Sequence, residues 1–348
     1  MLDGSDVDAR AARGNFGLVG AFGKGDGAPH YQRLSLDGVA LWPAFARALK
    51  EETDIDVEYE NDGCLNFCLG EEEFSRRTDD VARWNAQMPN VPAYARMIVR
   101  AELERRLPEA HLGPKVCGAG IGSGDGHCNP LKLLRALQKA IVLRGGTLVG
   151  NHRVSKINPH SDGTFEVHAQ TPGGTRPFHS QQLVIAAGLG SSGLSRMVGM
   201  DVPLRPQRGQ LLVTERLQPT LRLPASGIRQ TRDGTIMIGV SVEEVGMDLG
   251  TSTSVAARMT RRALAILPEL ASVRLVRHWS SLRIITPDEY PIYAESAEYP
   301  GAFVAVCHSG ITLAAFHAAT LASALARRKL PPGFEIFHNR RFDVSQVI

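Results

Sequence analysis

The sequence of 348 residues lacks the features that would carry it into a membrane or out of the cell. It opens with MLDGSDVDARAARGNFGLV, which has no cationic start followed by an apolar core and so is not a secretory signal peptide. No apolar run reaches the length of about 18 residues that a membrane-spanning helix requires. These absences predict a cytoplasmic protein without a transmembrane segment.

Cysteine is scarce, and its five positions form no metal-binding motif: Cys64, Cys68, Cys117, Cys128 and Cys307. An odd number of cysteines in a chain without an export signal predicts reduced thiols. Cys64 and Cys68, in CLNFC, resemble half of a metal site, but no second pair and no H-x-x-x-H motif accompanies them. We therefore expect buried structural thiols and no bound metal.

A strong excess of charge of either sign is also missing. The 39 Lys and Arg residues nearly balance the 36 Asp and Glu residues, and no basic run or aromatic-interleaved basic patch occurs, so nucleic acid is not an expected partner. Internal repeats and low-complexity tracts are absent as well. With 43% apolar residues, the chain can bury a substantial core, as two domains or as one large α/β domain with an inserted second layer.

Apolar spacing and end signals predict several helices. SLDGVALWPAFARALKEET carries a cap at Ser35 and a proline, Pro43, that should produce an early turn or kink. In NPLKLLRALQKAIVLRGG, Asn129 caps the helix and two glycines end it. Further helices are expected in EEEFSRRTDDVARWNAQM and in SVAARMTRRALAIL, where Ser254 is a candidate cap. The expected apolar stripe of the helix after Asn129 comprises Leu131, Leu134 and Ile141.

The segments between these helices carry β-strand signals. Residues 147–190 contain short β runs, broken by S-D-G and P-G-G turns, and include LVIAAG, which has the composition of a strand buried on both faces. RGQLLVTE and IRQTRDGTIMIGVS predict antiparallel runs, the second folded at an Asp233-Gly234 turn. VRLVRHWSSLRIITPDEYPIY predicts a strand that ends at a proline-marked turn. This mixture indicates two interleaved domains.

Two junctions join a strand to a helix through glycine: LVIAAGLGSSGL and FVAVCHSGITLAA. At each, backbone N–H groups can face an anionic or electron-rich ligand group, and glycine allows the ligand to approach the main chain closely. Such a junction also occurs as a tight strand–helix crossing that binds nothing. A binding protein of the α/β class is therefore an alternative on these residues alone.

Taken in order, six segments resemble the D-amino-acid-oxidase-like (DAO) family of FAD-dependent oxidoreductases: ARGNFGLV, DGHCNPLKLLRAL, LVIAAG, the RGQ strand, HWSSLRIITPDEYPIY and CHSGITLAA. Within the family, the resemblance is to the FAD subunits of opine oxidase, D-hydroxyproline dehydrogenase and hydrogen cyanide synthase. It implies an α/β (α+β) fold in which a Rossmann-like FAD-binding domain is interleaved with an antiparallel-sheet substrate domain. The implied FAD-binding domain comprises residues 1–35, 130–200 and 295–335, and the substrate-binding or cap domain comprises residues 36–129 and 201–294.

The resemblance also interprets the opening residues. A dinucleotide-binding unit consists of a strand, G-x-G-x-x-G, a helix and a second strand, which an acidic residue closes to hold the adenosine ribose. MLD resembles the end of that second strand, so Asp3 is the implied ribose-binding acid, yet no G-x-G-x-x-G precedes it. We expect a Rossmann-like domain without its N-terminal strand and glycine motif, and weakened flavin binding. Two explanations of the missing motif stay open: the start codon was set too late, or the protein is a genuine fragment. The alternative role of Asp3 is that of a solvated terminal carboxylate.

The family pattern implies further cofactor contacts along the chain. The alternatives to these contacts are a surface ion pair for Arg13 and ordinary turn roles for the asparagine and glycine of RGNFGL. The implied contacts are Arg13, Asn15, Gly17 and Leu18 along the pyrophosphate and flavin; Val154 at the adenine; Ala186, Ala187 and Gly188 at a second turn; and Gly310, Ile311, Thr312 and Leu313 at the start of a helix whose positive end faces the flavin.

Two residues are implied to take part in the reaction. Arg283, before the T-P-D turn, resembles the family arginine that binds the substrate carboxylate in a bidentate fork, which lysine cannot reproduce. His308, which precedes Ser309 and Gly310, would orient the substrate amine or tune the flavin; a hydrogen-bonded structural histidine is the alternative. Other relatives carry a larger polar residue in place of Ser309, which leaves a substrate contact there open.

The implied reaction is oxidation of a CH–NH bond in an amino acid or secondary amine, such as a D-amino acid, D-hydroxyproline, an opine or glycine. The flavin accepts the electrons, and water hydrolyses the imine. No dedicated general base is evident, and an amine bound in its neutral form needs none. The implied partners are subunits that carry an iron–sulfur centre, through which the protein could lie on the inner membrane. The alternative is an N-terminally truncated, cofactor-free fragment without activity.

Overall fold

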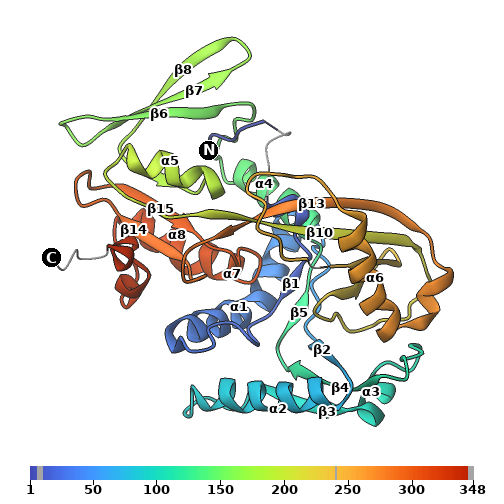
Figure 1. Ribbon diagram of the computed structural model, residues 1–348. Coiled ribbons are helices and arrows are strands. Elements are labelled where there is room, and N and C mark those ends of the chain that lie inside the picture. Colours follow the sequence, from blue (N-terminus) through green and yellow to red (C-terminus); the bar gives the residue numbers. More distant parts are fainter. Residues whose placement is uncertain (6–10, 240, 344–348) are drawn as a thin grey trace.

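The computed structural model describes residues 1–5, 11–239 and 241–343, which form helices and strands in several layers (Figure 1). The helices are α1 (Pro29–Thr53), α2 (Glu71–Ala86), α3 (Arg100–Arg106), α4 (Pro130–Leu143), α5 (Ser191–Arg196), α6 (Thr253–Ile266), α7 (Ala314–Phe316) and α8 (Ala322–Ala326). A π-helical turn, His317–Leu321, joins α7 to α8. The strands are β1 (Leu18–Val19), β2 (Cys64–Leu69), β3 (Ala95–Val99), β4 (Val116–Gly122), β5 (Gly126–His127), β6 (Arg153–Pro159), β7 (Phe165–Thr171), β8 (Gly174–Ser180), β9 (Leu183–Ile185), β10 (Arg205–Arg216), β11 (Ile228–Gln230), β12 (Thr235–Ile238), β13 (Leu275–Ile285), β14 (Ile292–Glu295) and β15 (Ala302–Val306).

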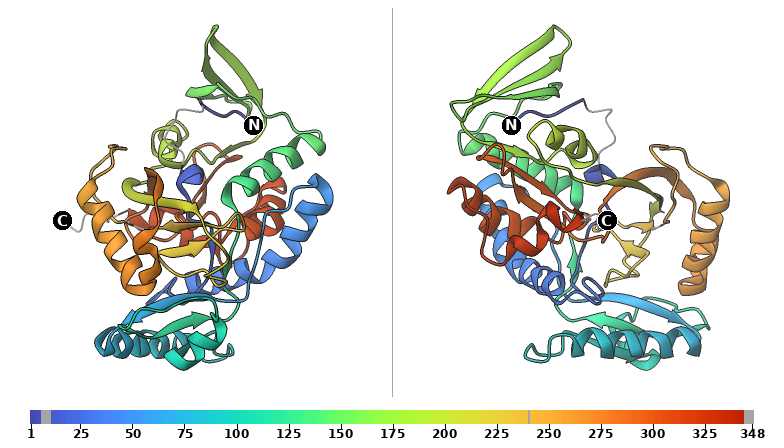
Figure 2. Two further views of the ribbon diagram at one scale, coloured as in Figure 1. Left: turned by 90° about the vertical axis from the view of Figure 1, so that its right-hand side faces the viewer. Right: turned by 60° about the vertical axis from the view of Figure 1, so that its left-hand side comes forward.

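One half of the molecule consists of two antiparallel sheets and α6. The larger sheet has the strand order β11-β12-β10-β13, and the smaller has the order β2-β4-β3. A parallel bridge between Leu65 and Ala225 links the two sheets. One hydrophobic core lies between them and α6, with Leu65, Ile228 and Leu267 fully buried. Figure 2 shows α2 at the outer end of this half, packed on the smaller sheet.

The other half is organised around β15, which pairs antiparallel with β14 and parallel with β9. Because β9 and β15 are parallel neighbours, their carboxyl ends, and the glycine turns that follow them, lie at one edge of the sheet. The antiparallel ribbon β6-β7-β8 projects at the far end of this half (Figures 1 and 2). Leu2 and Val154 pack against the same core as Ile185 and Val304.

This architecture confirms the expected mixed α/β (α+β) class with antiparallel layers. The division into an FAD-binding and a substrate-binding domain stays a prediction. Helix α1 crosses its boundary between residues 35 and 36, and it contacts α4 and α7, which both belong to the predicted cofactor side. We propose that all of α1 belongs to that side.

Helix α1 begins earlier than its sequence signals indicate. Pro29 occupies the first turn, where the missing N–H of proline costs no intrahelical hydrogen bond, and the helix continues through Pro43. Ser35 is therefore not a cap, because it lies inside the helix and its Oγ donates to the Tyr31 carbonyl at 2.8 Å. The fully buried Trp42 shows why the helix persists: packing of this face outweighs the local cost of proline.

Helix α4 confirms one local signal and corrects another. The Asn129 side-chain oxygen accepts hydrogen bonds from the Leu131 and Lys132 N–H groups, each at 3.2 Å, as expected for a cap. Leu131, however, is 56% exposed, so the predicted stripe with Leu134 and Ile141 was shifted. In α6 the cap position is Ser252 rather than Ser254. The buried side of α4 comprises Leu133, Ala136 and Ala140.

Strand β9 differs from the strand that LVIAAG predicts. It pairs with β15 alone in the described part of the chain, and Val184 is 44% exposed, so β9 is not buried on both faces. An apolar run indicates a strand but not the neighbours that cover it. The predicted turn at Asp233 and Gly234 is confirmed, because β11 and β12 pair antiparallel and Gly234 has a φ of 89°.

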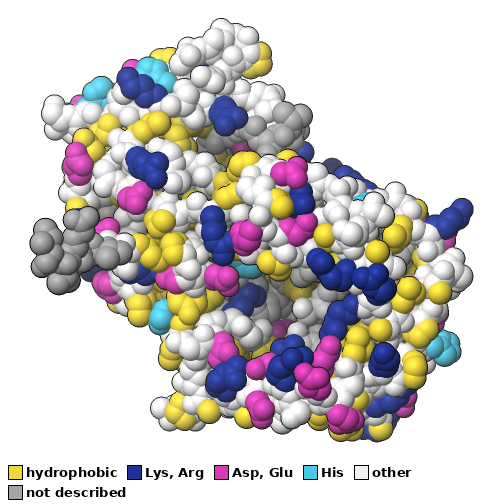
Figure 3. Space-filling view, viewed as in Figure 1, with side chains coloured by type: hydrophobic (Ala, Val, Ile, Leu, Met, Phe, Trp, Pro, Cys, Tyr) yellow, Lys and Arg dark blue, Asp and Glu magenta, His cyan; other side chains and the backbone are white. Residues whose placement is uncertain are grey.

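None of the helices in residues 1–5, 11–239 and 241–343 combines the length and the apolar character that crossing a membrane requires. The five cysteines are free, and Cys64, Cys68 and Cys128 are buried. In the same ranges no three metal-ligating side chains gather into a group. On the face in Figure 3, acidic and basic side chains are interspersed rather than separated into patches of one sign.

Candidate functional site

At one end of the candidate site, the opening residues lie beside the loop that leads into β6. Leu2 forms a parallel bridge with Val149, and the Asp3 N–H donates to the Val149 carbonyl at 2.9 Å. The Asp3 carbonyl accepts from the His152 N–H at 2.8 Å. Val154 packs against the same core as Leu2. The structure therefore brings Asp3 and Val154 into one neighbourhood, a placement compatible with contacts to one adenosine group.

The turn after β9 leaves its main chain accessible. Ala186 and Ala187 are exposed, and Gly188 has a φ of 58°. The Ala187 N–H donates to the Ser191 Oγ at 3.0 Å, which closes the turn. A Cβ atom on Gly188 would lie 3.2 Å from Cδ1 of Ile284, next to Arg283 in the chain. This turn is thus pressed against the strand that carries the predicted catalytic arginine.

The loop before β1 is held by its own side chains and by β5. The Asn15 Oδ1 accepts from the Gly17 N–H at 2.7 Å, and the Gly17 carbonyl accepts from the Cys128 N–H at 2.8 Å. Gly17 has a φ of 88°, and a Cβ atom there would lie 2.4 Å from the Cys128 carbonyl oxygen. Leu18 continues into β1, which pairs with β5. Arg13 is exposed, at the end of a short 3-10 turn that contacts β13.

The turn after β15 presents backbone N–H groups to an open space. Gly310 is exposed, and a Cβ atom there would meet only one sulfur atom, at 3.9 Å. The Leu313 N–H donates to the Ser309 carbonyl at 3.0 Å. The N–H groups of residues 310–312 have no hydrogen-bond partner among the described residues. They lie at the positive end of the helical segment 314–326, where an anionic or electron-rich group is favoured.

Arg283, on β13 opposite Gln207 of β10, is held by carbonyl oxygens. Its Nη2 donates to the Ser241 carbonyl at 2.9 Å, and its Nη1 lies 3.4 Å from the Gln207 Oε1 and from the Arg208 carbonyl. No carboxylate of the described residues pairs with it. Burial lowers the pKa of Arg283, and the charge of Glu243 partly offsets that shift. The guanidinium stays charged at neutral pH and remains available to an external carboxylate.

His308 follows β15, and its side chain is accessible from solvent. Desolvation by the surrounding protein, and then the charges of Lys24 and Arg283, lower the pKa of His308 to about 4. The ring is therefore neutral at pH 7, with one nitrogen that donates and one that accepts. The two basic side chains beside it make this end of the site favourable for an anion.

Lys24 belongs to this end of the site, although the motif analysis did not single it out. Its Nζ donates to the Thr312 Oγ1 at 2.9 Å and to the Gly20 carbonyl. The Gly20 N–H donates to the same Thr312 oxygen at 3.2 Å, so the N-terminal loop is tied to the turn after β15. Burial lowers the pKa of Lys24, and the charge of Asp125 partly offsets that shift. Its place in the glycine-rich GKGDG was the available signal.

Two buried hydrogen-bonded side-chain pairs near the site were not predicted from the sequence. The Tyr31 hydroxyl and the Ser309 Oγ share a hydrogen bond of 2.7 Å, and burial raises the pKa of Tyr31. The Asp125 Oδ1 accepts from the Tyr94 hydroxyl and from the Ala21 N–H, each at 2.6 Å. The side-chain partners are separated by 278 and 31 residues, and no local motif links them.

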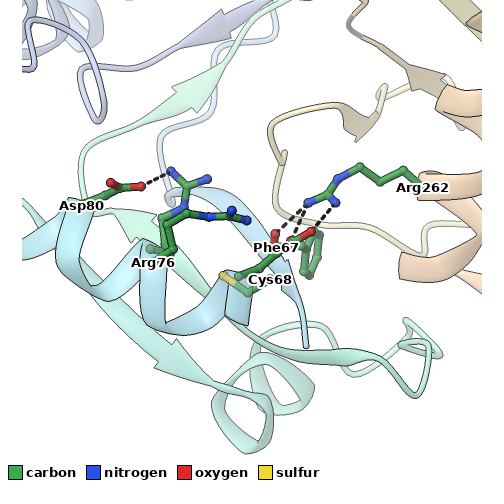
Figure 4. Close-up of a pocket in the computed structure, with 7 residues that line it drawn as sticks. Phe67, Cys68, Arg76, Asp80 and Arg262 are labelled. Carbon is green, nitrogen blue, oxygen red and sulfur yellow. Dashed lines mark hydrogen bonds and ion pairs between the residues drawn. The ribbon is translucent and has the colours of Figure 1, made fainter. Parts of the chain in front are cut away.

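None of the predicted site residues lines either of two surface pockets, although the second pocket includes Asp26 and Gly27, just after Lys24. In the first, of about 160 Å³, Arg262 of α6 pairs with Glu73 of α2 at 3.0 Å (Figure 4). Its lining is already occupied by internal ion pairs, so it is a weaker candidate for ligand binding. The first pocket is lined by Phe67, Cys68, Glu73, Arg76, Arg77, Asp80 and Arg262, and the second by Asp26, Gly27, Arg83, Ala86 and Gln87.

Two glycine turns after neighbouring parallel strands, beside an antiparallel sheet whose Arg283 has no carboxylate partner among the described residues, are typical of a nucleotide-binding α/β protein. The chain belongs to the DAO family of FAD dependent oxidoreductases, whose model matches residues 1–324. FAD is accordingly its cofactor. The exposed turn residues Ala186 and Ala187 and the N–H groups at 310–312 fit such a cofactor, because they lie at one sheet edge and can face its charged groups.

Curated relatives and solved structures are also similar to this chain over most of its length. The chain is 39% identical over 347 residues to an opine oxidase subunit of Rhizobium meliloti, a match that covers 100% of this chain and 92% of the relative. It is 29% identical over 321 residues to the hydrogen cyanide synthase subunit HcnC of Pseudomonas aeruginosa, covering 90% and 75% respectively. The crystal structure of glycine oxidase from Geobacillus kaustophilus has a TM-score of 0.84 at 25% identity, covering 98% of this chain and 91% of the other.

Proposed function

We propose that this FAD-dependent oxidoreductase oxidises the CH–NH bond of an amino acid or secondary amine that carries a carboxylate. A D-amino acid, D-hydroxyproline, an opine and glycine all belong to this class. The observation that supports it is Arg283, a partly buried guanidinium whose partners are carbonyl oxygens and which lies next to the turn at Gly188. The names of two relatives, an opine oxidase and a glycine oxidase, agree with a nitrogen-bearing acid as substrate.

The chain's own residues would contribute binding, orientation and electrostatics. FAD, when bound, supplies the acceptor for two electrons. Arg283 would bind the substrate carboxylate, and because Ser241 and Gln207 hold its guanidinium, the carbon beside the nitrogen is presented in one orientation. The neutral His308 would accept a hydrogen bond from the substrate amine. The free N–H groups at 310–312 would stabilise negative charge that develops next to them.

The same proposal assigns cofactor contacts to the remaining predicted residues. Asp3 and Val154 would hold the adenosine, the main chain at 186–188 would lie along the phosphates, and the loop 13–18 would run along the pyrophosphate and flavin. Two observations support this arrangement. Val154 packs on the same hydrophobic core as Leu2, and both the turn at Gly188 and the 3-10 turn that holds Arg13 contact β13. Ile311 and Thr312 would continue the contact at the flavin through their N–H groups. Leu313 is fully buried and its N–H donates to the Ser309 carbonyl, so it would support the turn from within.

The protein would act as one subunit of a hetero-oligomeric dehydrogenase. Two relatives, one an opine oxidase component and the other HcnC, are named as subunits, which supports a partner chain. Electrons would then pass to a partner that carries an iron–sulfur centre, and association with the cytoplasmic face of the inner membrane would be through that partner. Co-purification of partner chains with this chain at constant stoichiometry, with iron measured in the complex, tests this assignment.

The catalytic proposal is tested with a matched pair of amines. The purified protein is first scanned for flavin absorbance in the visible range, and then mixed with a dye acceptor and either D-proline or pyrrolidine, which differ only in the carboxylate. Dye reduction with D-proline or another carboxylate-bearing amine, but not with its carboxylate-free analogue, is the expected result. Equal rates with both members of the pair would contradict the role of Arg283, and no reduction with any amine would contradict the proposed reaction.

A further inference from the structure

Arg229 is a buried arginine that reaches from the substrate-side sheet to the N-terminal loop. It lies on β11 and is 3% exposed. Its Nε donates to the carbonyl of Phe16, and its guanidinium carbon lies 5.7 Å from the centroid of the Phe16 ring. The contact joins residues that are 213 positions apart. It therefore fixes a tertiary relation that no local sequence signal specifies.

The charge of Arg229 has no carboxylate partner among the described residues. Its Nη1 lies 3.2 Å from Nδ1 of His127, which is itself 7% exposed. Burial lowers the pKa of Arg229 to about 10, so the guanidinium is charged at neutral pH. Burial and the charge of Arg229 also lower the pKa of His127. The ring is therefore neutral, its Nδ1 accepts from Arg229, and its Nε2 lies 3.4 Å from the Glu60 carboxylate.

Among the described residues, the hydrogen bonds of Arg229 go to a carbonyl and to a neutral ring, and a buried charge without a carboxylate partner is costly to the folded state. Met237, which pairs with Arg229 across the sheet and packs in the same cluster as Phe16, is 8% exposed and shows that this face of the sheet otherwise carries buried apolar side chains. The position of the guanidinium accounts for the exception. A Cβ atom on Gly17 would lie 3.0 Å from Nη2 of Arg229, so Arg229 packs directly against the loop that precedes β1.

The same loop is also held by Cys128, the residue that follows β5. The Gly17 carbonyl accepts from the Cys128 N–H, and Cys128 follows His127 in the chain. Arg229, His127 and Cys128 therefore form one continuous support under residues 16 and 17. This support ties the Phe16–Gly17 peptide to the sheet that carries Arg283 on β13.

We propose that Arg229 is a positioning residue, which sets the Phe16–Gly17 peptide against the bound flavin by binding the Phe16 carbonyl, with His127 as its neutral support. The inference rests on the proposed placement of the 13–18 loop along the cofactor. Lysine at this position can reach one partner but cannot bind the carbonyl and the imidazole together, because it lacks the planar fork.

The experiment compares three variants of the whole protein: Arg229→Met, Arg229→Lys and the control Arg100→Met. Arg100 likewise donates to backbone carbonyls, those of Leu112, Gly113 and Val116, but it lies on α3, which packs against the smaller sheet. Two quantities are measured: hydrogen exchange of the amides in residues 14–20, which needs no cofactor, and the dissociation constant for FAD from visible absorbance. A third reading is the flavin absorbance spectrum, whose band positions report the groups around the ring.

We expect Arg229→Met to accelerate exchange in residues 14–20 by about tenfold or more and to weaken FAD binding by a similar factor. Arg229→Lys should recover part of both effects and shift the flavin bands, and Arg100→Met should change exchange only around residues 112–116. Unchanged exchange in the loop of either Arg229 variant would overturn the proposal. Accelerated exchange with unchanged FAD affinity and spectrum would overturn it as well, because the loop would then not support the flavin. If only the amine assay fails, the proposed reaction is contradicted. Hydrogen exchange, FAD affinity and the flavin spectrum still decide whether Arg229 positions the loop.

Discussion

The two ends of the candidate site are held in different ways. At the arginine end, which comprises Arg283 with residues 308–313, side chains from distant segments bind the turn: the Trp42 indole donates to the carbonyls at 311 and 312 at 3.1 and 3.0 Å. At the aspartate end, which comprises Asp3 and Val154, backbone hydrogen bonds join residues 1–4 to residues 149–152. The turn at residues 186–188 is exposed at Ala186 and Ala187 and contacts β13 through Gly188.

We attribute this difference to the roles proposed for the two ends. Orienting a reacting carbon requires side chains held in one rotamer, so the arginine end is over-determined by long-range contacts. Binding a nucleotide through N–H groups requires only accessible main chain in the right turn, which local geometry supplies. Substitutions at the arginine end should therefore change catalysis strongly, whereas those at the aspartate end should change cofactor affinity moderately.

The largest effect is expected from Arg283→Lys. Lysine lacks the bidentate fork, so kcat/KM for a carboxylate-bearing amine should fall by about 10²- to 10³-fold, equivalent to about 3–4 kcal/mol, with flavin content unchanged. Steady-state kinetics with a dye acceptor measure the change. The matched control is Arg277→Lys on the same strand, where the arginine stacks on Trp279 at 4.8 Å. An equal loss in both variants would show that the strand, rather than the carboxylate contact, is responsible.

The second comparison substitutes two glycines among the predicted cofactor contacts, one in the loop before β1 and one in the turn after β9. Gly17→Ala places a Cβ atom 2.4 Å from the Cys128 carbonyl oxygen at a φ of 88°, so we expect a loss of about 2–6 kcal/mol in the free energy of unfolding. Gly188→Ala meets only the end of a side chain, at 3.2 Å, and should cost about 1–2 kcal/mol. Urea unfolding measures both. The comparison fails if Gly188→Ala is the more damaging change.

A smaller effect is expected at the hydrogen bond between Tyr31 and Ser309. Tyr31→Phe leaves the buried Ser309 hydroxyl without this partner, so the free energy of unfolding should fall by about 1–3 kcal/mol. Ser309→Ala in the Tyr31→Phe background should then cost less than Ser309→Ala alone, because the partner is already gone. Urea unfolding of the two single variants and the double variant measures the coupling, and additive losses would refute it.

The smallest effect concerns pH. His308 and His317 have pKa values lowered to about 4, His317 by burial alone, from an ordinary value of 6.5. Between pH 6.5 and 4 the unfolded chain binds protons that the folded protein does not, so the free energy of unfolding should decrease as the pH falls through this window. His308→Gln should flatten part of that dependence and His317→Gln another part. If the free energy of unfolding depends on pH in both variants as it does in the unchanged protein, the lowered pKa values are contradicted.

Local signals predicted much of the fold. The Asn129 cap and the turn at Gly234 were confirmed because their hydrogen bonds and backbone angles involve neighbouring residues. The start of α1 and the exposed Leu131 were not predicted, because packing of distant segments decides them. For the site, the resemblance supplied Arg283 and His308, but Lys24 and Arg229 were missed, since their partners are 288 and 213 residues away.

By itself, the sequence determined the mixed fold class, the family and the positions of the two glycine turns, because periodicity, turn residues and ordered motifs are properties of neighbouring residues. Only the tertiary structure decided which charges are left without a carboxylate partner, which strand edge is exposed and which side chains support the Phe16–Gly17 peptide. These depend on contacts across more than 200 residues, such as Arg229 with Phe16, whose energies come from burial and desolvation rather than from local propensity.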